Sequence, residues 1–286
     1  MNPIVRRVII LGTPLALCIL TFFHPGVSTG AFEDLGPQVD WWITLHLLQL
    51  VLFSLLGLSA YLLLDGIQST AATCSRVALA SFVIFYPAAD TILGISTGIL
   101  IRNSAGLPDF PRAVAAQTIN TFFSGDPLAN VIAALGGFGW GIGILLAAVA
   151  LSRPAPVLSR LQWSRWLVIV PALLVGLAIA YYHAVSIILI YGLFPFDQVS
   201  AFVILLAVAL GMVVQPRLAV GLLVMAAYLF GISHAPPYGP SAMACYFVAA
   251  LQLEFFTRRH ALVEKDTGPI KTDIAPIEKE AAPDPS

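Results

Sequence analysis

Asp90 is the carboxylate placed deep inside an apolar run of this 286-residue chain, between Val77 and Ile101. An acid in the middle of a membrane helix costs roughly 3 kcal/mol, so such residues usually mark a site of function. A carboxylate in that position can hold a proton, a cationic cargo group or a metal ion. We therefore take Asp90 as the centre of the candidate site.

Histidines are the second group that could do chemistry, because an imidazole can exchange a proton or ligate a metal. Four of the five fall toward the same end of the expected helices, and only His260 does not. His46 and His183 lie within apolar runs, whereas His24 and His234 each end one. This clustering is the most informative functional feature of the sequence.

Helical spacing gives both groups polar neighbours. Gln49 follows His46 by three residues and shares its face, and Tyr86 precedes Asp90 by one turn. Pro87 removes a backbone donor and predicts a kink beside the acid. The candidate intramembrane polar cluster therefore comprises Asp90, His46, His183, Gln49 and Tyr86.

Two glycine patterns predict close helix contacts rather than catalysis. Gly94 and Gly98 form a small-xxx-small pair just after Asp90. A denser run, GGFGWGIG, spans residues 136–143 and lacks the Lys and the Ser or Thr of a phosphate-binding loop. We interpret both patterns as packing surfaces.

Several functions fit this polar cluster. Permease-like transport of a small molecule or of protons is favoured, with Asp90 as the protonatable or cargo-binding group. The main alternative is a membrane-embedded enzyme or redox subunit with an outward-facing His/Asp site, where His46 and His183 could ligate a haem or a metal. The cluster could also be a hydrogen-bonded network, or the chain a non-catalytic subunit of a membrane complex. The histidines and cysteines lack metal-ligand spacing, so the sequence assigns neither cofactor nor reaction.

The composition is typical of an integral membrane protein. Hydrophobic residues make up 59% of the chain and charged residues 10%, whereas soluble domains carry about 25% charged residues. About 20 apolar residues cross a bilayer, and they must be helical because the backbone cannot be hydrated there. The sequence predicts an all-α polytopic protein with about eight spans: Ile4–Phe23, Trp41–Leu64, Val77–Ile101, Leu128–Leu151, Trp166–Leu193, Val199–Val214, Leu218–Ile232 and Ser241–Phe256.

Basic residues set the expected orientation. Of the 14 Lys and Arg residues, only Arg102 and Arg112 fall on the side opposite the N-terminus, which favours cytoplasmic N- and C-termini. We expect a multi-pass protein of the plasma (inner) membrane. The net charge of −1 gives no reason to expect a nucleic-acid partner. The expected partner is the lipid bilayer, with a homo-oligomer or a membrane complex left open.

A weak internal likeness divides the transmembrane domain, residues 1–260, into halves 1–153 and 154–260. Phe22-Phe23-His24 in the first half corresponds to Tyr181-Tyr182-His183 in the second, which suggests a 4+4 parallel repeat. Residues 261–286, rich in Pro, Lys, Glu and Asp, are expected to form a disordered cytoplasmic tail. Between the third and fourth spans we expect a short helix lying in the outer interface, with Asp109 as its cap.

Overall fold

The computed structural model describes residues 1–152 and 216–257, and this part of the chain is helical with no strand. Four stretches are long and apolar enough to cross a membrane: Pro3–Phe22, Ala31–Leu63, Thr70–Ser104 and Asp109–Leu151. A shorter apolar helix covers Leu218–Ile232. These helices are compatible with a membrane protein. The expected spans at 166–193 and 199–214 lie outside the described residues, so the count of eight and the internal repeat stay predictions.

Most spans are built from more than one helical element. In chain order the elements are α1 (Pro3–Arg7), η1 (Val8–Gly12), α2 (Thr13–Phe22), α3 (Ala31–Leu35), η2 (Gly36–Gln38), α4 (Val39–Leu63), α5 (Thr70–Asp90), η3 (Thr91–Ser96), α6 (Thr97–Ser104), α7 (Asp109–Gly125), α8 (Pro127–Leu151), α11 (Pro216–Ile232), α12 (Tyr238–Gln252) and η5 (Leu253–Thr257). The segments η1, η3 and η5 are π-helical, and η3 begins directly after Asp90.

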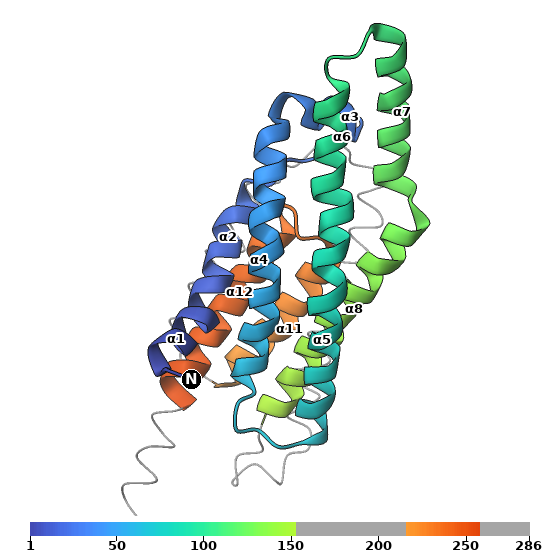
Figure 1. The fold of residues 1–286 in the computed structure, drawn as a ribbon. Helices are drawn as coiled ribbons and strands as arrows, with labels where there is room; N and C mark the ends of the chain where they lie inside the picture. Colours follow the sequence, from blue (N-terminus) through green and yellow to red (C-terminus); the bar gives the residue numbers. More distant parts are fainter. Residues whose placement is uncertain (153–215, 258–286) are drawn as a thin grey trace, which may run out of the picture.

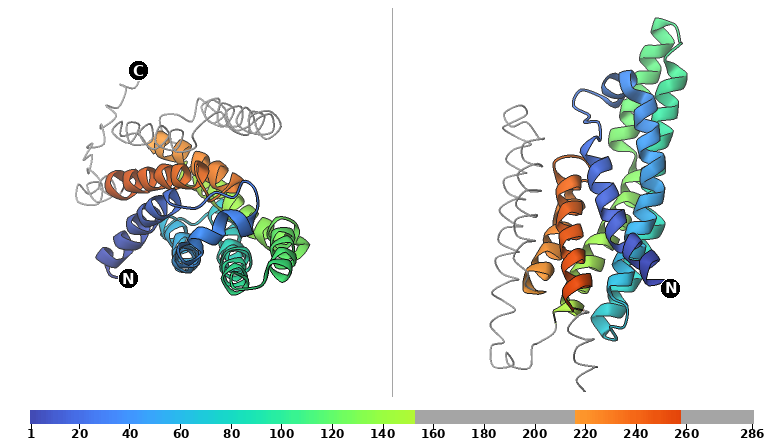
Figure 2. Two further views of the ribbon diagram at one scale, coloured as in Figure 1. Left: turned by 90° about the horizontal axis from the view of Figure 1, so that it is seen from above. Right: turned by 90° about the vertical axis from the view of Figure 1, so that its left-hand side faces the viewer.

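The helices differ in how far they reach along the bundle. In Figure 1, α6 and α7 reach the top of the molecule, which we call the upper end, and α4 ends somewhat below them. The elements α2, α11 and α12 stop well below it, as the second view in Figure 2 also shows. Packing of α2 against both α12 and α4 joins the short helices to the long ones. Long helices therefore pass beside the point where short helices end.

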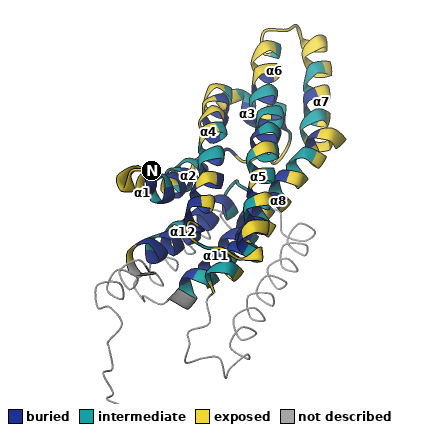
Figure 3. Ribbon diagram, turned by 60° about the horizontal axis from the view of Figure 1, so that its bottom comes forward, coloured by how far each residue is buried: buried dark blue, intermediate teal, exposed yellow. Residues whose placement is uncertain are grey.

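The core is aromatic in its centre. Phe53, Phe82, Trp140, Phe230 and Tyr246 are fully or almost fully buried in one cluster contributed by α4, α5, α8, α11 and α12. Buried residues lie on the faces that helices turn toward one another, and exposed residues on the outside (Figure 3). Large apolar side chains on that outside match a surface that faces lipid.

Glycines set the closest helix approaches, as the sequence predicted. A Cβ at Gly136 or Gly139 of α8 would collide with the backbone of α5 at Tyr86 or Phe82. A Cβ at Gly94 would collide with the ring of His46, and one at Gly98 with Ile43 and Trp42 on α4. Both glycine patterns therefore serve packing, and the pair Gly94 and Gly98 brings α4 against the segment that follows Asp90.

Two local expectations are wrong. Asp109 does not cap α7, because Pro108 holds the cap position and Asp109 instead pairs with Arg112 at 2.7 Å. The α7 helix also runs alongside α6 instead of lying across the bundle (Figure 1).

A buried ion pair ties the lower ends of the helices together. Arg6 on α1 pairs with Glu254 in η5, and both side chains are at least nine-tenths buried. The same guanidinium donates to the carbonyl of Leu62 at 2.6 Å. Arg6 thus connects the first helix to the ends of α4 and α12.

Candidate metal centre

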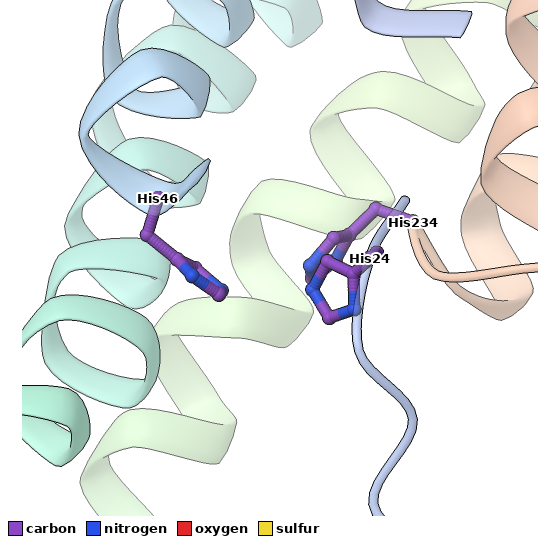
Figure 4. Close-up of side chains that lie close together, drawn as sticks. All are labelled: His24, His46 and His234. Carbon is purple, nitrogen blue, oxygen red and sulfur yellow. The ribbon is translucent and has the colours of Figure 1, made fainter. Parts of the chain in front are cut away.

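Three histidines from distant parts of the chain converge at one point. One ring nitrogen each of His24, His46 and His234 lies within 4.8 Å of the other two. Figure 4 shows the ring of His46 pointing across a short gap toward those of His24 and His234. The ring centroids of His24 and His234 are 4.9 Å apart, and those of His24 and His46 are 5.3 Å apart.

The lengths of the helices explain this meeting. His24 follows the end of α2 at Phe22, and His234 follows the end of α11 at Ile232, so both stand above short helices. His46 lies within α4, which passes beside those ends. The histidines thus come from two loops and one helix.

Hydrogen bonds fix how the imidazoles are oriented. Nδ1 of His46 lies 2.8 Å from the carbonyl oxygen of Trp42, and Nδ1 of His24 lies 2.8 Å from that of Pro25. A carbonyl only accepts, so both Nδ1 atoms carry the proton and each Nε2 keeps a free lone pair. Metal-bound histidines characteristically have their other ring nitrogen held in this way.

Tyr86 completes the pattern at the third histidine. Its hydroxyl lies 2.9 Å from Nδ1 of His234, and Nε2 of His234 is buried without a hydrogen bond. Nε2 of His24 is likewise buried without a partner. All three Nδ1 atoms are therefore engaged, and the Nε2 atoms are left for another ligand.

Asp90 faces the same point from α5. One oxygen of its carboxylate lies 3.8 Å from Nε2 of His46 and 3.9 Å from Nε2 of His234. These distances are too long for hydrogen bonds, and both carboxylate oxygens are buried without one. Buried polar atoms are nearly always satisfied, and three groups around this point are not: Nε2 of His24, Nε2 of His234 and the carboxylate of Asp90.

The spacing is close to that of a coordination sphere. Metal–imidazole bonds are about 2.1 Å long, so nitrogens of a tetrahedral site lie about 3.4 Å apart. Side-chain movements of about 1 Å would bring the three imidazole nitrogens to that separation. The protonation state of His24, which follows the end of α2, suits the same role. Burial and, to a smaller extent, the nearby His46 lower the pKa of its imidazole to about 3. A neutral imidazole is the form that binds metals.

The backbone after Asp90 makes room for His46. The π-helical segment η3 follows Pro87, which lies inside α5. Trp42 on α4 donates through Nε1 to the carbonyl of Gly94 at 2.7 Å. π-Helical segments often occur at functional sites, and this one lets the imidazole lie directly against Gly94.

Of the residues singled out in the sequence, Asp90, His46 and Tyr86 meet at this point. Gln49 is fully buried one turn below His46. His183 lies outside the described residues. His24 and His234 were missing from the predicted cluster, although both end an apolar run at the same side as the others. Sequence alone does not reveal that α2 and α11 end near Asp90, the last residue of α5.

Comparison of the chain with protein-family models, with curated proteins and with solved structures finds no match.

Proposed function

We propose that this protein is a membrane metalloprotein that holds one divalent transition-metal ion through His24, His46 and His234, with Asp90 as fourth ligand. The observation that carries the proposal is the convergence of three imidazoles whose Nδ1 atoms are already engaged. Three imidazoles and a carboxylate suit Zn²⁺, Fe²⁺, Mn²⁺ or Co²⁺ better than the soft ion Cu⁺. Such a set supports metal-dependent enzyme or redox chemistry.

Transport through the centre has less support. Below the histidines the described helices are closed by Phe53, Leu56, Phe82 and Phe230, all fully or nearly fully buried. A permeating ion needs polar groups along its route. The site is therefore proposed to load from the upper end and to keep its ion.

Haem and a serine nucleophile also fit poorly. A haem held by two of these histidines would need the space that the third imidazole fills. Two G-x-S-x-G sequences occur, at 26–30 and 94–98, but Ser28 contacts Asp34 and Ser96 donates to the carbonyl of Thr91. Neither serine lies in the strand-to-helix turn that such a nucleophile requires.

The helix lengths support a place for the centre at the membrane boundary. The 20 residues of Pro3–Phe22 would span about 30 Å, the thickness of the hydrocarbon core. With that helix across the bilayer, His24 stands at its edge, and the basic residues favour the outer edge. Small molecules outside the cell would then have the shortest route to the ion.

Metal analysis of the purified full chain tests this proposal. After loading with Zn²⁺ or Co²⁺ and removal of free ion, we expect about one ion per chain in wild type and in the control Ser59→Ala. His24→Ala, His46→Ala and His234→Ala should each lose most of it. Wild type without bound ion, or histidine variants that load as wild type does, would refute the centre.

A further inference from the structure

Gln49 is a buried polar side chain that the metal ligands do not account for. It is fully buried on α4, and neither its amide nitrogen nor its amide oxygen has a hydrogen-bond partner among the described residues. An unsatisfied buried amide destabilises a fold. A residue retained at that cost needs an explanation beyond packing.

The register of α4 against α5 places Gln49 beside the centre. The two helices run antiparallel, with His46 against Gly94 and, seven residues further along α4, Phe53 against Tyr86 at a ring distance of 5.0 Å. Gln49 lies between these contacts on the same face of α4 as His46 and Phe53. The residue opposite it on α5 is therefore Asp90.

Two unsatisfied polar groups thus lie at one level under the histidines. The amide of Gln49 and the carboxylate of Asp90 do not bond to each other, since both carboxylate oxygens lack partners. Below them the ring of Phe53 packs on Tyr86 and Phe230, at 5.0 Å and 5.7 Å. These aromatic rings therefore lie on the side of Gln49 and Asp90 that faces away from the histidines.

We propose that Gln49 binds a small anionic ligand of the metal ion by donating a hydrogen bond to it from the amide N–H. This inference rests on the metal centre proposed above. Four stronger ligands surround the ion already, so the amide is free to act on a fifth, exogenous one. Aromatic rings underneath limit that ligand to a few atoms. The substrate class of the centre is accordingly a small anion or an equally small oxygen donor.

Azide binding to the cobalt-loaded full chain tests this assignment, followed by the visible absorption of Co²⁺. Gln49→Leu and Gln49→Met remove the donor at similar volume. Both should retain cobalt and bind azide about 10-fold more weakly, the loss expected for one hydrogen bond to a charged group. Ser59→Ala, a buried polar substitution further along α4, should bind azide as wild type does.

The metal-free proteins provide a second readout. Because the amide has no partner, Gln49→Leu should melt at the same temperature as wild type or higher, whereas a structural hydrogen-bond role predicts a lower one. Azide affinity within about twofold of wild type in both variants, or loss of cobalt from both, would overturn the role of Gln49. Cobalt-loaded wild type that binds no azide would overturn it as well. Wild type without cobalt would instead refute the centre itself.

Discussion

Replacing Gly94 by alanine should displace His46 and cost the centre a ligand. A Cβ at residue 94 would lie 2.7 Å from Nε2 of His46 and still closer to two ring carbons. Ordinary contacts between such atoms are about 3.5–4.0 Å, so the ring has to move by about 1.5 Å. Metal–ligand distances tolerate about 0.2 Å, and the imidazole would therefore leave the coordination sphere.

The magnitude follows from the number of ligands. Disturbing a group that only supports a ligand weakens metal binding by about 10–100-fold, so loss of the ligand itself should cost at least about 100-fold. Overpacking between α4 and η3 should lower the stability of the metal-free protein by about 1–3 kcal/mol.

A chelator competition with Co²⁺, together with thermal unfolding, measures both effects. Gly137→Ala is the matched control, because a Cβ at that position of α8 would meet no atom within 4 Å. This control should keep wild-type affinity and be as stable or slightly more stable, since alanine favours a helix. A folded Gly94→Ala protein that binds cobalt as tightly as wild type would show that His46 is not a ligand.

Three further predictions concern Asp90, Tyr86 and the buried pair of Arg6 with Glu254. Asp90→Asn should weaken metal binding at least about 10-fold but leave the melting temperature of the metal-free protein unchanged or raised, because the carboxyl group that it replaces makes no hydrogen bond to the described residues. A clearly lower melting temperature would favour a structural network. Tyr86→Phe should weaken metal binding by about 10–100-fold in the chelator competition, because it removes the hydroxyl that contacts His234. The control Tyr246→Phe loses a buried contact to a serine hydroxyl and should bind metal as wild type does. Equal effects of the two substitutions would contradict the role of Tyr86. Arg6→Met or Glu254→Leu alone should lower the free energy of unfolding by about 3–5 kcal/mol, because each leaves the other charge buried without its partner. The double variant should lose much less. Equal losses in all three variants would argue against a buried pair.

The helical class and the packing glycines could be predicted because each depends on local pattern. Long apolar stretches must be helical in a bilayer, and Gly94 and Gly98, one turn apart, permit close approach wherever a second helix comes near. Asp90 and His46 were found by the cost of placing polar groups in apolar runs. None of these inferences needs knowledge of which helices are neighbours.

The composition of the site could not be predicted in the same way. His24 and His234 belong to it because α2 and α11 are short and stop beside the middle of two longer helices. That depends on tertiary arrangement and leaves only a faint trace in the sequence, namely histidines at the ends of two apolar runs. Pro87 predicted a kink, but the π-helical segment after Asp90 and its bond from Trp42 follow from packing against α4.

The order of the proposed ligands along the chain bears on how the protein is made. His24, His46 and Asp90 lie in the first third of the sequence, and His234 lies near its end. Three of the ligand residues would therefore be synthesised long before the fourth, and the early helices would lie in the membrane with unsatisfied polar groups until then. Docking of α11 would close the centre, and a metal ion captured at that moment would fasten the last helices to the first. Metal supply would then govern the yield of assembled protein as well as its activity.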